Sequence, residues 1–265
     1  MNIGLIIIGD EILSGKRQDK HLAKVIELLA ARGMALAWAR YAGDERAQIT
    51  PALRQAFDSG DLVFSCGGIG ATPDDHTRQC AAAALDRPLV LHPGAKALIL
   101  ERMRDVADEQ GRPFEPERPD NVQRLQMGYF PEGAALIPNP YNKIPGFSVG
   151  EVHFLPGFPV MAWPMIETLL DTRYRALHGR QRQRERAVIV RGAAEAALTP
   201  LMEAVEQRFP DIKVFSLPCV DEQHVHGRHI ELGVKGPPAR VDDAFLVLRQ
   251  GLDALAADLG PELVR

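Results

Sequence analysis

A buried strand that ends in a cluster of glycines constrains the fold of this chain more than any other feature. Residues 62–66 form the apolar run LVFSC, and three of the next four positions, 67–70, are glycine. A helical pattern follows over 77–85. A strand that passes through a glycine turn into a helix leaves backbone N–H groups unpaired at the carboxyl edge of a sheet, where a phosphate binds well. The expected ligand-binding residues here are Gly67, Gly68, Ile69, Gly70 and Thr72.

Acidic residues accompany this loop and two others. Asp74 and Asp75 follow the glycines, Asp44 follows the second predicted strand, and Asp10 and Glu11 follow the first. Loops after parallel strands share one sheet edge, so these side chains are expected to converge. A carboxylate beside a phosphate repels it unless a divalent cation lies between them. We therefore predict a cation such as Mg²⁺ held by Asp44, Asp74 and Asp75. Asp44 and Asp75 are the predicted catalytic residues, and Asp10 and Glu11 are predicted ligand-binding residues.

Each of these acids also has a simpler interpretation. Aspartate is a good N-cap, so Asp44 could cap the helix that follows it. Asp74 or Asp75 could likewise cap the next helix, and Asp10 and Glu11 could be incidental charges in a turn. The glycines alone could be present to supply unusual backbone angles. The sequence leaves both interpretations open.

The alternation of strands with amphipathic helices predicts an α/β fold. It favours a three-layer sandwich whose central sheet is mostly parallel, with right-handed crossovers. The expected strands are 2–8, 34–42, 62–66, 134–137 and 151–155. The expected helices are 19–32, 77–85, 93–109 and 120–126, with two more after residues 44 and 159.

A change in composition separates a second region. Between residues 173 and 186 six positions are arginine and few are apolar, which is typical of a solvated linker. The order strand, helix, strand, strand, helix beyond it predicts a small α+β module of the ferredoxin-like type. Its expected strands are 187–190, 213–217 and 229–234, and its expected helices are 194–209 and 241–255. The predicted domains are therefore 1–172 and 187–265, joined by an Arg-rich linker at 173–186.

Composition limits the partners and the location. The net charge of -4 and the pI near 6.1 argue against a nucleic-acid-binding protein. The apolar run at the N-terminus lacks the features of a signal peptide and is too short to span a membrane. The 3 cysteines include no CxxC pair. These observations together predict a cytoplasmic protein with no membrane partner.

Several other catalytic motifs are not matched. The glycine loop is neither a Walker loop nor a G-x-G-x-x-G fingerprint, and no G-x-S-x-G sequence is present. Cys66 is interpreted as a small buried residue at a strand end rather than as a nucleophile. His224, His226 and His229 lie on a predicted hairpin without an accompanying Cys or carboxylate set. This pattern favours a surface position over a metal site, and the sequence assigns the three histidines no role.

Motifs in a fixed order along the chain resemble one known family. Residues 67–70 with Asp75 and Thr77 resemble the GGTG-xxxx-D-x-T pattern of the MoaB/MogA molybdopterin-binding fold, and Asp44 matches the other signature aspartate of that fold. The run GDEILSG at 9–15 is closer to the N-terminal domain of CinA and to the molybdopterin-binding-like domain of FAD synthase. Further CinA-type motifs lie at 131–134, 139–140, 145–147 and 155–159. The resemblance covers residues 2–170.

The functions that this resemblance implies differ between branches. MogA-type members bind molybdopterin and adenylylate it, whereas the CinA and FAD-synthase relatives are associated with metal-dependent hydrolysis of pyrophosphate bonds in ADP-ribose- or FAD-like dinucleotides. The chain departs from CinA at Asp19 and His21, where CinA has asparagines. The expected partner is a phosphate-bearing small molecule, either a pterin such as molybdopterin or a dinucleotide. Relatives form dimers or trimers, so a homo-oligomer is expected.

Two main functions follow from the residues and the resemblance. The first is a metal-dependent hydrolase of a pyrophosphate bond. The second is a binding module for a pterin or nucleotide in molybdenum cofactor metabolism, with no turnover of its own. A scaffold that docks through the arginine segment is a third hypothesis. The sequence does not name the ligand, the metal or the oligomer.

Overall fold

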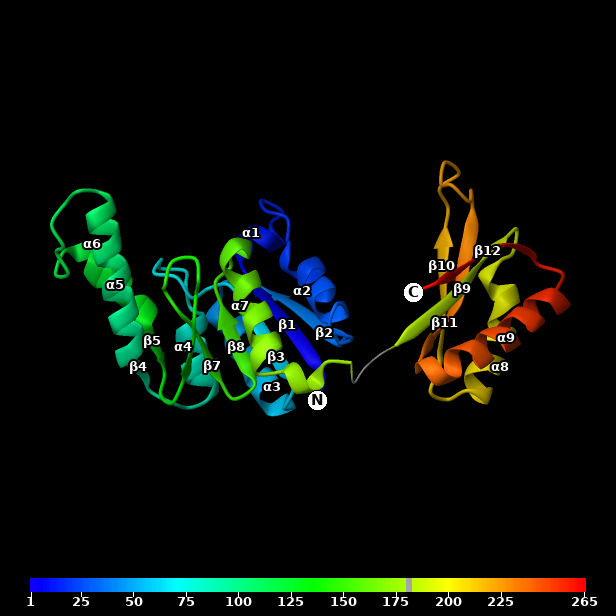
Figure 1. The fold of residues 1–265 in the computed structure, drawn as a ribbon, viewed down its shortest axis with the longest axis horizontal. Helices are drawn as coiled ribbons and strands as arrows, with labels where there is room; N and C mark the ends of the chain where they lie inside the picture. Colours follow the sequence, from blue (N-terminus) through cyan, green and yellow to red (C-terminus); the bar gives the residue numbers. More distant parts are fainter. Residues whose placement is uncertain (180–182) are drawn as a thin grey trace. The chain divides into compact units, whose positions relative to one another are not determined.

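A computed structural model describes residues 1–179 and 183–265 and divides the chain into two compact units (Figure 1). Unit 1 comprises Met1–Ala176 and unit 2 comprises Leu177–Arg265. The clusters of buried hydrophobic residues at the centres of the two units have no member in common. Positions 180–182 of the predicted Arg-rich linker lie outside the described residues.

Unit 1 is built on a six-stranded sheet. Its strands are β1 (Ile3–Ile8), β2 (Trp38–Ala42), β3 (Leu62–Cys66), β6 (Ala135–Ile137), β7 (Gly146–Val149) and β8 (Val152–Leu155). They lie in the order β2-β1-β3-β8-β7-β6. The strands β2, β1, β3 and β8 are parallel, and β7 and β6 add two antiparallel strands at one side. The sheet is therefore mostly parallel, as predicted.

Helices cover the centre of this sheet, so that every residue of β1 and β3 is buried. The helices concerned are α2 (His21–Ala30), α3 (Arg46–Ser59), α4 (Thr77–Ala84) and α7 (Pro159–Thr172). Ile6 and Val63 on one face join Ile49 and Leu53 of α3 and Ala81 of α4 in the main cluster of unit 1. The helix α3 packs against α4, and α2 packs against α7. Burial on both faces explains why the two strands are continuous apolar runs.

The remaining elements of unit 1 are short or peripheral. They are the helices α1 (Asp10–Leu13), α5 (Pro93–Glu109) and α6 (Pro119–Leu125), the 3-10 turns η1 (Gln126–Gly128) and η2 (Arg175–Leu177), and the two-stranded sheet of β4 (Leu89–Leu91) and β5 (Tyr129–Pro131). The strand predicted from residue 34 begins only at Trp38, because residues 33 and 34 still belong to the hydrogen-bonded turn that ends α2. The N–H groups of Gly33 and Met34 donate back to the carbonyls of Ala30 and Leu29.

Unit 2 is a ferredoxin-like module. Its elements are β9 (Arg184–Arg191), α8 (Glu195–Arg208), β10 (Lys213–Cys219), β11 (His229–Gly236), α9 (Pro238–Ala254) and β12 (Asp258–Val264). The sheet order is β10-β11-β9-β12, and all of its pairs are antiparallel. The sequence pattern predicted the first five elements, and β12 completes the β-α-β-β-α-β order.

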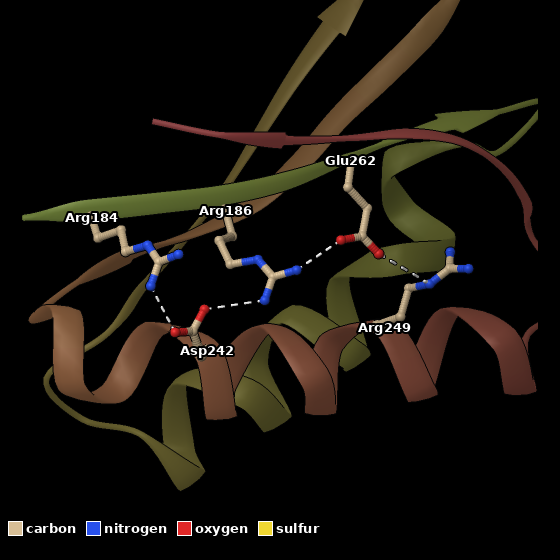
Figure 2. A network of polar contacts seen from close by, with 5 residues as sticks. All are labelled: Arg184, Arg186, Asp242, Arg249 and Glu262. Atoms are coloured by element: carbon tan, nitrogen blue, oxygen red, sulfur yellow. Dashed lines mark hydrogen bonds and ion pairs between the residues drawn. The ribbon is translucent and has the colours of Figure 1, made fainter.

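The arginine-rich segment enters the sheet earlier than predicted, because β9 begins at Arg184. The Arg184 guanidinium donates to the Asp242 carboxylate of α9 at 2.7 Å. The Arg186 guanidinium donates both to Asp242, at 3.1 Å, and to Glu262 of β12, at 2.7 Å (Figure 2). The guanidinium of Arg186 also lies 4.2 Å from the centre of the Phe245 ring. These partners on α9 and β12 are distant in sequence. The linker prediction is therefore wrong at positions 184–186, which belong to strand β9. Ion pairs with acids and packing on an aromatic ring allow charged side chains at these strand positions.

None of the helices within residues 1–179 and 183–265 has the length and apolarity needed to cross a membrane.

Candidate functional site

A cavity of about 600 Å³ lies at the carboxyl edge of the parallel strands in unit 1. The segments that follow β1, β2, β3 and β8 all contribute to its wall, together with the turn at 139–145. Among the acids predicted to converge there, Glu11, Asp44, Asp74 and Asp75 line the cavity. The topology therefore brings these side chains to one place, as expected for loops at one edge of such a sheet.

Two glycines after β3 have backbone conformations that exclude other residues. Gly67 has a φ of 111° and Gly68 a φ of 67°. A Cβ at Gly67 would lie 2.1 Å from the carbonyl oxygen of Ile8, and a Cβ at Gly68 would lie 2.2 Å from the Thr77 hydroxyl. Thr77 is fully buried, and its hydroxyl donates to the Gly67 carbonyl at 3.0 Å. Glycine is thus required at both positions by φ and by space.

The backbone amides of the loop divide into two groups. The Gly67 N–H donates to the Leu155 carbonyl at 3.0 Å, which ties the loop to β8. The Gly70 N–H donates to Asp75 Oδ1 at 2.9 Å. The N–H groups of Gly68 and Ile69 have no acceptor among the described residues. The prediction that all four amides of 67–70 are available for phosphate therefore needs correction, because only these two remain available.

Asp75 holds the loop in shape. Its Oδ1 accepts the Gly70 N–H, and its Oδ2 accepts the N–H of Thr72 at 2.8 Å and also the Thr72 hydroxyl. The interpretation of Asp75 as a helix cap is wrong, because α4 has His76 at its N-cap and no side-chain cap bond. Both carboxylate oxygens of Asp75 are already hydrogen-bonded, so Asp75 acts as a positioning residue for the loop.

Asp44 is placed by the loop after β1. Its Oδ2 accepts the Asp10 N–H at 2.9 Å, and its own N–H donates to Asp10 Oδ1 at 3.2 Å. The helix α3 has Glu45 at its N-cap and no side-chain cap bond, so Asp44 does not cap it. Burial raises the pKa of the Asp44 carboxyl, and the negative charges of Asp10, Glu11 and Asp74 raise it further. Asp10 itself does not line the cavity and acts through Asp44.

Asp74 differs from its neighbour in exposure. Its side chain is exposed, and a hydrogen bond from Thr72 lowers the pKa of its carboxyl. The Thr72 hydroxyl also donates to Asp75 Oδ2, so it lies within reach of both aspartates. This leaves Asp74 ionised on the cavity wall.

Two cations near the loop were missed by sequence reasoning. Arg17 lines the cavity wall and is exposed. Arg78 lies beneath the loop, where it is 3% exposed and donates from Nη2 to the Gly70 carbonyl. Burial lowers the pKa of Arg78 to about 10, so its guanidinium remains charged at neutral pH. Arg17 is only two residues past the GDEILSG run, whereas no local pattern marks Arg78.

The carboxylates of the cavity fit a hard divalent cation in ligand type. Glu11, Asp44 and Asp74 supply the oxygen atoms that Mg²⁺ prefers, and the charges of Glu11 and Asp74 add to burial in raising the pKa of Asp44. Asp75 has less acceptor capacity to offer an ion than these three acids, because both of its oxygens accept loop hydrogen bonds. Within residues 1–179 and 183–265, no three cavity acids form a preassembled cluster of ligand atoms.

Comparison with known proteins identifies relatives of unit 1. Residues 4–176 match a family model described as a probable molybdopterin binding domain. A CinA-like protein of Geobacter sulfurreducens is 32% identical over 273 residues, covering 100% of this chain and 61% of the relative. A CinA-like protein of Syntrophotalea carbinolica is 29% identical over 237 residues, covering 84% of this chain and 55% of the relative. Other curated relatives are matched over only 38% of their own length.

A solved structure supports the same fold. The crystal structure of the protein CinA from Thermoplasma acidophilum, described as having unknown function, is 28% identical with a TM-score of 0.53. The match covers 64% of this chain and 96% of that chain.

Proposed function

The chain belongs, through residues 4–176, to the family of probable molybdopterin-binding domains, and from that premise we propose that the cavity of unit 1 binds a phosphate-bearing pterin or dinucleotide and hydrolyses its pyrophosphate bond with a divalent cation. One observation carries the proposal. The Gly68 and Ile69 amides, which have no acceptor among the described residues, line the same cavity as Glu11, Asp44 and Asp74.

The two kinds of group act on different parts of the ligand. The loop amides bind phosphate oxygens, and Arg17 adds positive charge at the cavity wall. Arg78 adds a buried positive charge beneath the loop, where solvent screens it less. Asp75 keeps the amides in place through its bonds to Gly70 and Thr72. These groups bind the anion without any contribution from Glu11, Asp44 or Asp74.

Hydrolysis needs a base for the attacking water, and Asp44 fits this role. A water oxygen forms a bond to phosphorus, the bridging P–O bond breaks, and the water gives up a proton. Asp44 Oδ2 is held by the Asp10 N–H, which leaves Oδ1 to accept that proton. The raised pKa of Asp44 makes it a stronger base than an ordinary aspartate. Glu11 and Asp74 would hold the cation, which when bound neutralises phosphate oxygens.

Replacement of the proposed base tests the reaction. The parent is expected to release AMP from ADP-ribose or FAD when Mg²⁺, Mn²⁺ or Co²⁺ is added. Asp44→Asn keeps an oxygen for the Asp10 N–H but loses the base, so the rate is expected to fall about 100-fold or more. Asp58→Asn, the same change at an exposed position on α3, is the matched control and is expected to behave like the parent. Equal rates for the parent and Asp44→Asn would contradict the proposal.

A binding module without turnover is the second candidate. It is favoured by the hydrogen bonds of Asp75, since both oxygens of that signature aspartate stabilise the loop. Calorimetric titration with ADP-ribose, FAD and a pterin phosphate separates the candidates. Tight binding without AMP release supports the module, and the absence of both binding and release argues against either function.

A further inference from the structure

The β10–β11 hairpin of unit 2 brings a cysteine and two histidines together. Cys219 ends β10 and His229 begins β11, and the two residues are directly paired across the ladder. His224 lies in the loop of residues 220–228 between them. Figure 1 shows the strands β10 and β11 that this loop connects. Cys219 Sγ and one imidazole nitrogen from each histidine lie within 4.8 Å of one another. In the described parts of the chain, this is the one group of three such ligands close enough to share an ion.

The ligand types identify the class of ion. A thiolate with imidazole nitrogens suits borderline transition metals, Zn²⁺ above all, and does not suit Mg²⁺ or Ca²⁺. Bond lengths of about 2.3 Å to sulfur and about 2.0 Å to nitrogen place ligand atoms roughly 3.5 Å apart around a tetrahedral zinc. A closure of about 1 Å is therefore sufficient, and His224 lies in an exposed loop that leaves its side chain room to move.

Hydrogen bonding already orients one of the ligands. His229 is buried, and its Nδ1 lies 2.7 Å from the Gly227 carbonyl oxygen. A ring that donates from Nδ1 to a backbone carbonyl presents an unprotonated Nε2, and metal-binding histidines are usually fixed in this way. The Nδ1 of His224 accepts a longer contact of 3.2 Å from the His226 N–H. Binding through Nε2 of His224 would move its proton to Nδ1 and break that weak contact.

A third imidazole lies next to the group. The ring centres of His224 and His229 are 4.8 Å apart, and the ring of His226 lies 5.5 Å from the first and 5.7 Å from the second. Imidazoles that share one tetrahedral zinc have ring centres about 5 Å apart, given a Zn–N distance of about 2.0 Å. The three rings therefore lie at about the spacing of imidazoles around one zinc.

We propose that Cys219, His224 and His229 form a binding site for Zn²⁺ or a similar transition metal ion, with His226 beside the fourth position. Bound metal fastens the loop end of the β10–β11 hairpin, where backbone pairing stops at Cys219 and His229. The site is separate from the cavity of unit 1 and differs from it in ligand chemistry, so it stands whether or not the proposed hydrolysis is correct.

Metal titration of the full chain tests the site. Protein stripped with a chelator and kept reduced is titrated with Zn²⁺ against a chromophoric chelator, and with Co²⁺ as an optical probe. The parent is expected to show sulfur-to-cobalt charge-transfer absorption and the visible bands of tetrahedral cobalt, both displaced by Zn²⁺. Cys219→Ser removes the charge-transfer absorption, and His224→Ala weakens Zn²⁺ binding about 100-fold or more. Gln223→Ala, an exposed neighbour in the same loop, is the matched control and keeps the parent affinity.

Thiol labelling gives an independent measurement. Cys66 and Cys80 are 1% and 2% exposed, so a thiol reagent added to the folded protein is expected to react with Cys219 alone. Zn²⁺ is expected to protect Cys219 in the parent and in Gln223→Ala but not in His224→Ala. Co²⁺ spectra without the charge-transfer absorption in the parent, or Zn²⁺ affinity unchanged by both Cys219→Ser and His224→Ala, overturns the proposal.

Discussion

Single residues show how the glycine loop of unit 1 is kept in shape. Gly68 has a left-handed conformation against the buried Thr77, and Asp75 accepts the amide of Gly70. A Cβ at Gly70 would lie 2.5 Å from Asp75 Oδ2, so this glycine lets the carboxylate approach the backbone. The loop geometry is thus fixed by contacts below it, while the amides of Gly68 and Ile69 stay available above.

Gly68→Ala is expected to destabilise unit 1 more than an equivalent change elsewhere. Gly60 is the matched control, because it has the same φ of 67° but open space around it. A left-handed alanine costs about 1–2 kcal/mol at either site. At Gly68 the clash with Thr77 adds roughly 2 kcal/mol. Urea unfolding followed by tryptophan fluorescence measures both, since Trp38 and Trp163 both lie in unit 1. Equal losses in the two variants would show that the space at Gly68 is not limiting.

The position of the loop was predictable from sequence, but the roles of its acids were not. A strand followed by glycines is a local pattern, and β3 with its turn lies where the pattern placed it. Asp75 could equally have capped a helix, bound a metal or braced the loop, because one carboxylate does any of these. The structure distinguishes them through the amides of Gly70 and Thr72. Arg78 was missed since its contact with the Gly70 carbonyl depends on the path of the turn.

At the scale of elements, a buried polar chain links β7, β8 and the end of α7. His153 of β8 is fully buried, with Nδ1 2.6 Å from the Ser148 hydroxyl and Nε2 in contact with the Tyr174 hydroxyl. Tyr174 donates in turn to Glu151. One arrangement of protons satisfies the chain. Ser148 donates to Nδ1, and Nε2–H donates to Tyr174, so the imidazole is neutral.

Acid is expected to destabilise unit 1 through this histidine. Burial, and then the positive charge of Arg173, lower the pKa of His153 to about 3. The folded state therefore binds no proton at His153 between pH 6.5 and pH 3, whereas the unfolded chain does. The stability from neutral His153 is present above pH 6.5 and is lost as pH falls, by up to about 1.4 kcal/mol per pH unit.

Replacement of the histidine isolates this effect from other acid-sensitive groups. Urea midpoints from tryptophan fluorescence are compared at pH 7.5 and about pH 5.5, the lower pH being roughly one unit below the ordinary histidine pKa. His153→Gln is expected to be less stable than the parent at about pH 7.5 and to lose less stability on acidification. A parent and variant with the same pH slope would show that His153 is not the group responsible.

Elements buried on both faces were predictable, whereas edge elements were not. The runs that became β1 and β3 are apolar throughout because helices cover both sides of the sheet. The strand β12 contains Gly260 and Pro261, which sequence rules count against a strand. It is tolerated at an edge where it pairs with β9 alone and shifts register between Leu259 and Glu262. The pairing of Cys219 with His229 could not be predicted either, because a long hairpin loop does not determine the register of the two strands that it connects.

At the scale of the whole molecule, the two units carry separate cores and separate candidate sites. The oxygen-rich cavity belongs to unit 1, and the Cys/His group belongs to unit 2. The family match covers residues 4–176, which is nearly the extent of unit 1. Because hydrophobic cores give domains most of their stability, units with separate cores are expected to unfold separately.

Core truncations in the two units test this independence. Leu53 of α3 and Leu248 of α9 are both fully buried, the first in the core of unit 1 and the second in that of unit 2. Each change to alanine is expected to cost about 2–5 kcal/mol in its own unit. Leu53→Ala should lower the urea midpoint seen by tryptophan fluorescence. Leu248→Ala should leave that midpoint unchanged. In the transition seen by circular dichroism, it should lower the urea midpoint only of the part that comes from unit 2. If Leu248→Ala lowers the fluorescence midpoint as much as Leu53→Ala does, the two units unfold as one, and metal bound to the hairpin of unit 2 would then also stabilise unit 1 by mass action.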